Sequence, residues 1–308
     1  MAILFYSESD KPFEWKRAFS KLAPDLDFYV WPDCKKLDEV EVALVWNPPI
    51  GMINNCPNLR LIASLGAGVD HLFKNFSSSH VPITRIVDET LTEQMVEYVV
   101  MATLFCHRSM PKYLHQQKQS NWTQILQPLG RDCTVGIMGL GVLGGAVSYA
   151  LKGLNFNVRG WSRSHKSLDG VKTYSSLEEL DQFLDGTNIL ICLLPLTPET
   201  VKIIDAKLLK KLPKGSYVIN AGRGAQLVEQ DLIEALDEEH ISHAFLDVVC
   251  SEPLPENNPL WSHSKVTLTP HIASITNPFS SASIIIDNLI RVRSGKRPLY
   301  EVNSEKGY

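Results

Sequence analysis

Three residues in the second half of the sequence, Arg223, Glu252 and His271, carry side chains that can act together in chemistry. A guanidinium binds a carboxylate, or polarises a carbonyl, through planar and bidentate hydrogen bonds. A histidine transfers a proton near neutral pH, and a carboxylate beside it orients the ring and stabilises its charged form. A single histidine or arginine is usually structural, but the combination favours proton transfer to or from a bound carbonyl compound.

Each of these residues comes shortly after an apolar run that is typical of a β-strand. The three runs are Tyr217–Ile219, Ala244–Val249 and Val266–Leu268. Parallel strands of an open sheet end along one edge, and ligands bind in the crevice outside that edge. We therefore expect the three side chains to meet in one site, although they are far apart in the sequence.

A glycine-rich motif upstream of this trio predicts a dinucleotide site. The strand-like run Thr134–Met138 leads into Gly139, Gly141 and Gly144 in the spacing GxGxxG, and an apparent helix follows through Leu151. In this motif the first glycine makes a tight turn and the second lets the backbone approach a pyrophosphate. The third permits close helix packing, and the helix N-terminus attracts the phosphate charge. The flanking strand and helix favour this interpretation over an ordinary glycine-rich turn.

The residues that follow the next strand-like run favour NADP(H) over NAD(H). An NAD site carries an acidic residue about 20 positions after the glycines, where it binds the ribose hydroxyls. This sequence has Ser162 at that place, with Arg163 and Lys166 close by. A hydroxyl and two cations suit a 2′-phosphate, which a carboxylate would repel. The alternative is that the two basic residues are solvated loop charges.

Composition and charge narrow the class of protein. The 308 residues exceed one comfortable core and predict two domains. The net charge of −4 argues against non-specific nucleic-acid binding. The six cysteines form no CxxC pair and no metal-ligand spacing, so we expect no metal site and a reducing, cytoplasmic location. The amino terminus lacks the features of a signal peptide, and no apolar run is long enough to span a membrane.

The pattern of runs predicts an α/β protein with two doubly wound parallel-sheet domains. We expect a substrate domain at residues 1–98 with 276–308, and an inserted dinucleotide-binding domain at 99–275. One long helix over residues 90–118, capped by Thr92, should connect them, and residues 120–131 should form an arm that reaches a partner subunit. Expected elements of the first domain are a helix at Trp15–Leu22 and strands at Ile3–Tyr6, Phe28–Trp31, Val42–Trp46, Leu61–Ser64 and Ile83–Ile86.

A set of ordered motifs places these features in a known family. The motifs are Ala43–Pro49, Leu65–Asp70, Glu93–Tyr98, Gly139–Gly144, Trp161–Arg163, Leu193–Thr200, Arg223–Gly224, Leu246–Val248, Glu252–Pro255 and Thr269–His271. Over nearly its whole length the sequence resembles the NAD(P)-dependent D-2-hydroxyacid dehydrogenases, most closely their glyoxylate/hydroxypyruvate reductase A branch. One departure is the segment Asn220–Gly222 before the arginine, where a bulkier apolar residue is common in the family.

The resemblance implies a role for each residue of the site. Arg223 would bind a 2-keto acid, His271 would protonate the keto oxygen, and Glu252 would pair with His271. Residues implied to bind substrate are Trp46, Ala67, Gly68 and Arg223. Residues expected to contact the cofactor are Gly139, Leu140, Gly141, Val142, Leu143, Gly144, Ser162, Arg163, Ser164, Leu194, Pro195, Ala221, Asp247, His271 and Ser274.

The activity that the resemblance implies is NADPH-dependent reduction of glyoxylate or hydroxypyruvate to the D-2-hydroxy acid. It also implies a homodimer formed through the cofactor domain and a cleft that closes on binding. Two alternatives remain open. One is a reductase of a bulkier 2-keto acid, and the other is a non-catalytic NAD(P)-sensing protein on the same fold.

Overall fold

The computed structural model describes residues 1–73, 81–303 and 307, and it divides into two compact units. One unit comprises Met1–Leu91 with Ile275–Tyr308, and the other comprises Thr92–Ser274. The first unit is therefore discontinuous in sequence. The expected limit at residue 98 falls inside helix α3 (Glu89–His107), a few residues after the point where the chain passes into the second unit.

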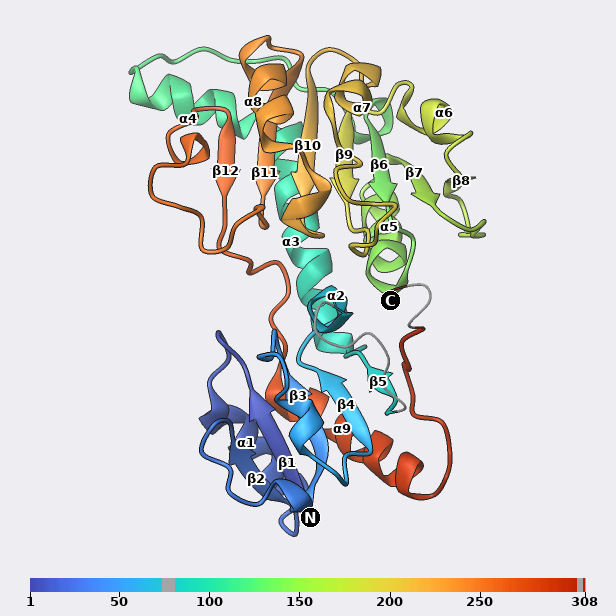
Figure 1. Ribbon diagram of the computed structural model, residues 1–308. Helices are drawn as coiled ribbons and strands as arrows, with labels where there is room; N and C mark the ends of the chain where they lie inside the picture. The colour runs from blue at the N-terminus through green and yellow to red at the C-terminus, as the bar shows by residue number, and fades with distance from the viewer. Residues whose placement is uncertain (74–80, 304–306, 308) are drawn as a thin grey trace. The chain divides into compact units, whose positions relative to one another are not determined.

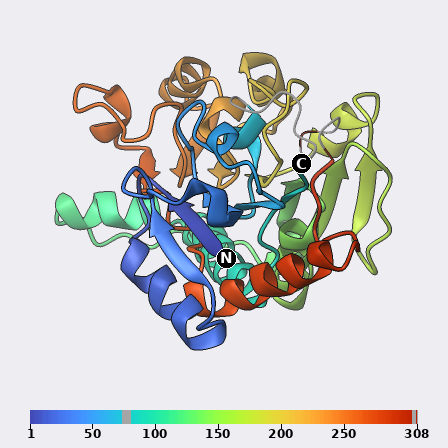
Figure 2. The ribbon, with the colours of Figure 1, turned by 60° about the horizontal axis from the view of Figure 1, so that its bottom comes forward.

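The first unit is built on a five-stranded parallel sheet with the order β2-β1-β3-β4-β5 (Figure 1). This is the flavodoxin-like order of a doubly wound sheet. Helices α1 (Pro12–Leu22) and α9 (Pro278–Arg293) lie side by side and pack on one face (Figure 2). The strands are β1 (Ala2–Tyr6), β2 (Asp27–Val30), β3 (Val40–Val45), β4 (Leu61–Ser64) and β5 (Ile83–Thr84). The short segments η1 (Leu37–Glu39), η2 (Ile53–Asn55) and α2 (Asp70–Phe73) complete the unit.

The second unit is built on a seven-stranded parallel sheet with the order β12-β11-β10-β9-β6-β7-β8. Its two faces form separate apolar cores, one with α3 and α5 and the other with α6, α7 and α8. The strands are β6 (Thr134–Met138), β7 (Asn157–Ser162), β8 (Lys172–Ser175), β9 (Ile189–Cys192), β10 (Ser216–Asn220), β11 (Ile241–Leu246) and β12 (Val266–Leu268). The helices and short turns are α4 (Met110–Lys118), η3 (Gly130–Asp132), α5 (Val142–Gly153), α6 (Leu180–Leu184), α7 (Ala206–Lys211), η4 (Gly224–Gln226), α8 (Glu229–Asp237) and η5 (Pro259–Trp261). The predicted pair of doubly wound parallel sheets is confirmed.

The single long helix predicted for residues 90–118 is wrong, because the segment forms α3 and α4 with a break between them. Ser109 at the break has a φ of 56°, and Pro111 lies in the first turn of α4. Proline has no N–H to donate and fits only the start of a helix, so it ends the preceding helix. The predicted cap is also wrong, since the Asp88 carboxylate accepts the Thr90 N–H at 2.7 Å and α3 begins before Thr92.

Candidate active site

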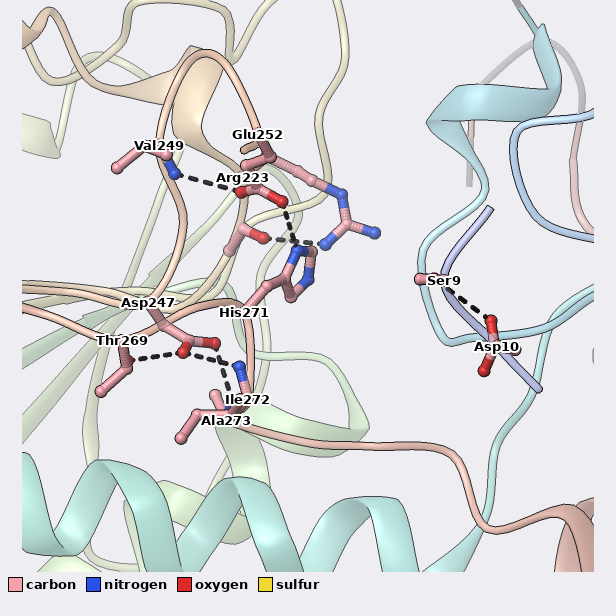
Figure 3. Close-up of polar contacts among 11 residues, drawn as sticks. Ser9, Asp10, Arg223, Asp247, Val249, Glu252, Thr269, His271, Ile272 and Ala273 are labelled. Carbon is pink, nitrogen blue, oxygen red and sulfur yellow. Dashed lines mark hydrogen bonds and ion pairs between the residues drawn. The ribbon is translucent and has the colours of Figure 1, made fainter. Parts of the chain in front are cut away.

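The three candidate catalytic residues follow three neighbouring strands of the second sheet. Arg223 comes after β10, Glu252 after β11 and His271 after β12, and these strands pair in that order. Their carboxyl ends lie at one edge because all the pairs are parallel. Figure 3 shows the three side chains gathered at that edge. The predicted meeting of a guanidinium, a carboxylate and an imidazole is therefore present in the structure.

His271 and Glu252 form a direct pair. The Nδ1 atom of His271 lies 2.7 Å from Oε2 of Glu252, while Oε1 of Glu252 accepts the Val249 N–H at 3.1 Å (Figure 3). Burial raises the pKa of Glu252, but the hydrogen bond and charge of His271, the Val249 N–H and the charge of Arg223 outweigh it and lower that pKa below its ordinary value. The ionised carboxylate thus engages Nδ1, and Nε2 is the ring nitrogen that can exchange a proton with a ligand.

Arg223 is partly buried and lies within electrostatic reach of Glu252. Its Nη1 atom donates to the Gly222 carbonyl at 2.8 Å, which folds the guanidinium back over its own backbone (Figure 3). The Arg223 main-chain N–H donates to Oε1 of Gln226 at 2.8 Å. A planar group held at its base in this way can present a bidentate edge to a carboxylate or carbonyl.

The loop that carries His271 is anchored by Asp247, whose side chain is 2% exposed. Its oxygens accept the hydroxyl of Thr269 at 2.7 Å and the N–H groups of Ile272 and Ala273, each at 2.8 Å (Figure 3). The Tyr98 hydroxyl lies 2.5 Å from that of Thr269, which links α3 to the same network. His271 itself has a φ of 55°, a conformation that a non-glycine residue keeps only where its surroundings hold it.

The glycine motif has the shape that a dinucleotide pyrophosphate requires. Gly139 has a φ of 103°, and a Cβ there would lie 2.6 Å from the Leu193 carbonyl oxygen. A Cβ at Gly144 would lie 1.8 Å from the Gly139 oxygen, so only glycine permits this packing. A Cβ at Gly141 would meet nothing within 4 Å, which leaves the N-terminus of α5 open to a ligand. The residues present therefore fit an NAD(P) cofactor.

Strand β7 ends at a buried serine, and the segment after it carries exposed basic side chains. Ser162 is buried and its Oγ donates to the Ser164 carbonyl at 2.8 Å, while Arg163 and Lys166 are exposed. The pKa of nearby Glu199 is lowered, chiefly by its hydrogen bond with Thr197, and the charge of Arg163 contributes. Two exposed basic side chains therefore lie close to the end of β7.

The other predicted cofactor residues also lie where strands of the second sheet end. Leu194 and Pro195 follow β9 and form a fixed lip, because the Thr200 hydroxyl donates to the Pro195 carbonyl at 2.7 Å and accepts the Thr197 N–H at 2.8 Å. The remaining residues are Leu140, Val142 and Leu143 around the first turn of α5, Ala221 after β10, and Ser274 after the His271 loop.

The predicted substrate residues of the first unit cluster after β3 and β4. The Trp46 ring packs against the tilted ring of His71 with centroids 4.2 Å apart, and a Cβ on Gly66 would touch that indole at 3.0 Å. The Ser64 hydroxyl donates to the Gly68 carbonyl at 2.9 Å and accepts the Gly66 N–H at 3.3 Å, which shapes the turn that carries Ala67 and Gly68. Sequence reasoning missed the packing role of His71.

Within the described residues, no group of three or more histidine, cysteine or acidic side chains is placed to hold a metal ion. In the same residues, no helix has the length and apolar character needed to cross a membrane.

Comparison with known proteins gives consistent results. Residues 100–273 match the model of the D-isomer specific 2-hydroxyacid dehydrogenase, NAD binding domain. A D-isomer specific 2-hydroxyacid dehydrogenase from Xanthobacter autotrophicus Py2, solved with NADPH and MES, is 39% identical with a TM-score of 0.96, over 100% of this chain and 99% of that chain. A probable 2-hydroxyacid dehydrogenase from Rhizobium etli CFN 42, solved with NADP, HEPES and L(+)-tartaric acid, is 35% identical with a TM-score of 0.91 and the same coverage. An NADPH-dependent glyoxylate/hydroxypyruvate reductase from Sinorhizobium meliloti, solved with NADP and sulfate, is 34% identical with a TM-score of 0.94 over 100% and 99% of the two chains.

Proposed function

Because the chain belongs to the D-isomer specific 2-hydroxyacid dehydrogenases, we propose that it reduces glyoxylate or hydroxypyruvate to the D-2-hydroxy acid with NADPH. The family supports NAD(P)-dependent 2-hydroxyacid dehydrogenase activity, and the Sinorhizobium meliloti neighbour supports the choice of substrate. The observation that carries the proposal is the His271–Glu252 pair at 2.7 Å beside Arg223, in a unit whose glycine motif fits a dinucleotide.

In this proposal each residue of the site has one task. The reduced nicotinamide, when bound, supplies the hydride that adds to the carbonyl carbon. Arg223 binds the carboxylate and the carbonyl oxygen and stabilises the negative charge that develops there. His271 gives the proton on Nε2 to that oxygen, and Glu252 stabilises the imidazolium. We assign the substrate carboxylate also to the Ala67 and Gly68 amides, the pocket wall to Trp46, and the nicotinamide carboxamide to Asp247.

A panel of 2-keto acids assayed with NADPH and with NADH tests the proposal. We expect kcat/KM to be highest for glyoxylate or hydroxypyruvate with NADPH. A higher value for a branched or aromatic keto acid would favour the reductase of a bulkier substrate. NADPH binding without turnover of any keto acid would favour a cofactor-sensing protein.

The choice of cofactor predicts the effect of Ser162→Asp. The new carboxylate would repel a 2′-phosphate and could accept hydrogen bonds from a free ribose. We expect kcat/KM for NADPH to fall about 30-fold, on the order of 2 kcal/mol for a like-charge contact near a protein surface, while the value for NADH is kept or rises. Ser283→Asp, which adds the same charge at an exposed position of α9, serves as the control. Equal losses with both cofactors would contradict the assignment.

The lowered pKa of Glu252 predicts how the activity depends on pH. A carboxyl with a lowered pKa stays ionised, and keeps its pair, until the pH falls below the ordinary range of glutamate. Reduction needs the imidazolium, so its rate should fall as the pH rises. In Glu252→Gln the imidazolium loses its counter-charge, so kcat/KM for reduction should fall at neutral pH. Glu256→Gln, at an exposed position nearby, should keep the wild-type kcat/KM.

The arm at residues 120–131 supports a homodimer as part of the proposal. This segment is irregular, as predicted, up to the start of η3 at Gly130, and Trp122 and Leu126 are 100% and 96% exposed. Side chains of this size are usually covered, and a second copy of the chain would bury them. Sedimentation should therefore give the mass of a dimer, and a monomer at all concentrations would overturn this assignment.

We also propose that the protein works in the cytoplasm. All six cysteines are free thiols, and five of them are buried. A chain that keeps its thiols reduced suits a reducing compartment. Location of a tagged copy in a cell fraction tests this point, and secretion with formation of disulfides would contradict it.

A further inference from the structure

The side chain of Gln226 is fully buried and uses its whole hydrogen-bonding capacity. Its exposed fraction is 0%. Its Nε2 atom donates to the carbonyls of Leu194 at 2.9 Å and Pro195 at 3.1 Å. Its Oε1 atom accepts the Arg223 main-chain N–H at 2.8 Å and the Cys192 thiol at 3.3 Å. A primary amide has two donors and two acceptor sites, so every one of them is satisfied.

The four partners come from two neighbouring strands with different tasks. Cys192, Leu194 and Pro195 belong to the end of β9 and the lip assigned to the cofactor, whereas Arg223 follows β10 and is assigned to the keto acid. Burial raises the pKa of the Cys192 thiol to about 12, so the sulfur keeps its proton and can donate to the amide. One side chain therefore joins the backbone of the cofactor lip to the backbone of the arginine.

Gly222 is fitted to this amide. A Cβ at residue 222 would lie 2.5 Å from Oε1 of Gln226 and 3.1 Å from the Leu194 carbonyl oxygen. Asn220 completes the arrangement, because its Oδ1 accepts the Gly222 N–H at 3.1 Å and its Nδ2 donates to the Arg223 carbonyl at 3.2 Å. The absence of a side chain at residue 222 makes room for the glutamine amide.

We propose that Gln226 is a positioning residue that ties the cofactor lip to Arg223, with Gly222 as its steric partner. The inference rests on the proposed function for its kinetic readout, and on the contacts above for its structural one. Loss of the amide leaves the Leu194 carbonyl and the Arg223 N–H short of a buried partner, while the Pro195 carbonyl keeps the hydrogen bond from the Thr200 hydroxyl. The backbone then relaxes, and both the lip and the base of the guanidinium move together.

The test compares Gln226→Ala, Gly222→Ala and the double variant with the wild type. Steady-state kinetics with glyoxylate and NADPH is measured beside NADPH affinity from nicotinamide fluorescence. We expect Gln226→Ala to lower kcat/KM for glyoxylate about tenfold, mainly through KM, and to raise the Kd of NADPH several-fold. The alkaline limb of the pH profile should not move, since the His271–Glu252 pair is untouched. Gln230→Ala removes the same side chain from an exposed position of α8 and should behave as the wild type.

The double variant separates positioning from a general loss of stability. If the two residues act through one contact, the loss in the double variant equals that of the larger single variant. Losses that multiply, or wild-type kinetics and affinity in Gln226→Ala, would overturn the proposal. If Gln226→Ala does not fold, Gly222→Ala keeps the amide but displaces it, and a wild-type Gly222→Ala overturns the proposal in the same way. If the wild type reduces no keto acid, the proposed function fails, and coupling of the two residues in NADPH affinity still decides the role of Gln226.

Discussion

Replacing His271 by alanine is expected to lower kcat for keto-acid reduction about a thousandfold, in the range that a positioned general acid contributes. The affinity for NADPH should stay within about twofold, because the glycine motif that fits the pyrophosphate lies on β6 and α5. The reason is that Nδ1 of His271 is engaged by Glu252 at 2.7 Å, so that Nε2 is the atom that protonates the oxygen. Single-turnover oxidation of bound NADPH measures this step directly.

The second unit offers a matched control for this variant. Nε2 of His263 lies 3.3 Å from Oδ1 of Asp237, which is also a histidine–carboxylate pair. His263→Ala should therefore keep the wild-type kcat. If His271→Ala turned over at the wild-type rate, or if both histidine variants lost activity equally, the assignment of His271 as the acid would be wrong.

Replacing Arg223 by lysine is expected to lower kcat/KM for glyoxylate about a hundredfold, although the positive charge is kept. Lysine has a single ammonium group and cannot form the two parallel hydrogen bonds of a guanidinium with a carboxylate. The loss should appear in KM and kcat together, because the same group binds the substrate and stabilises the developing alkoxide. Arg223→Ala should be lower still.

The affinity for oxamate, an analogue of glyoxylate that cannot accept hydride, isolates the binding part of this effect. We expect oxamate to inhibit the wild type competitively and to inhibit Arg223→Lys far more weakly. Arg297→Lys makes the same exchange at an exposed position of the first unit and should change neither value. Equal inhibition of the wild type and Arg223→Lys would show that the guanidinium does not hold the carboxylate.

The strands and the main site were predictable because their signals are local. The apolar runs before Arg223, Glu252 and His271 mark β10, β11 and β12, and the carboxyl ends of parallel strands must share an edge. The glycine spacing likewise carries its own turn geometry. The residues of the site could therefore be chosen without knowledge of their contacts.

The residues that hold the site in place could not be predicted, because their hydrogen-bond partners are distant in sequence. Nothing near Asp247 indicates that it anchors Ile272 and Ala273, and nothing near Gln226 indicates that it reaches the Leu194 carbonyl. Asp247 is a buried acid and Gln226 is a buried amide, and the packing of the strands determines which hydrogen-bond partners each one meets. Side chains of this kind are found only once the strands are placed.

Strand β8 and helix α6, near one edge of the second sheet, were not predicted, for a different reason. Strand β8 (Lys172–Ser175) buries only Tyr174, and helix α6 (Leu180–Leu184) is a single short turn. Such edge elements carry too few apolar residues for a period to be recognised. The break before α4 was, by contrast, visible in the sequence at Pro111 and was overlooked.

A crystal structure of the protein with NADP⁺ and oxamate measures most directly whether Arg223 and His271 act on one ligand. We expect the Arg223 guanidinium to bind the oxamate carboxylate, and Nε2 of His271 to lie within hydrogen-bond distance of the amide oxygen that stands in for the keto oxygen. Oxamate held by other residues, with neither Arg223 nor His271 in contact, would contradict it.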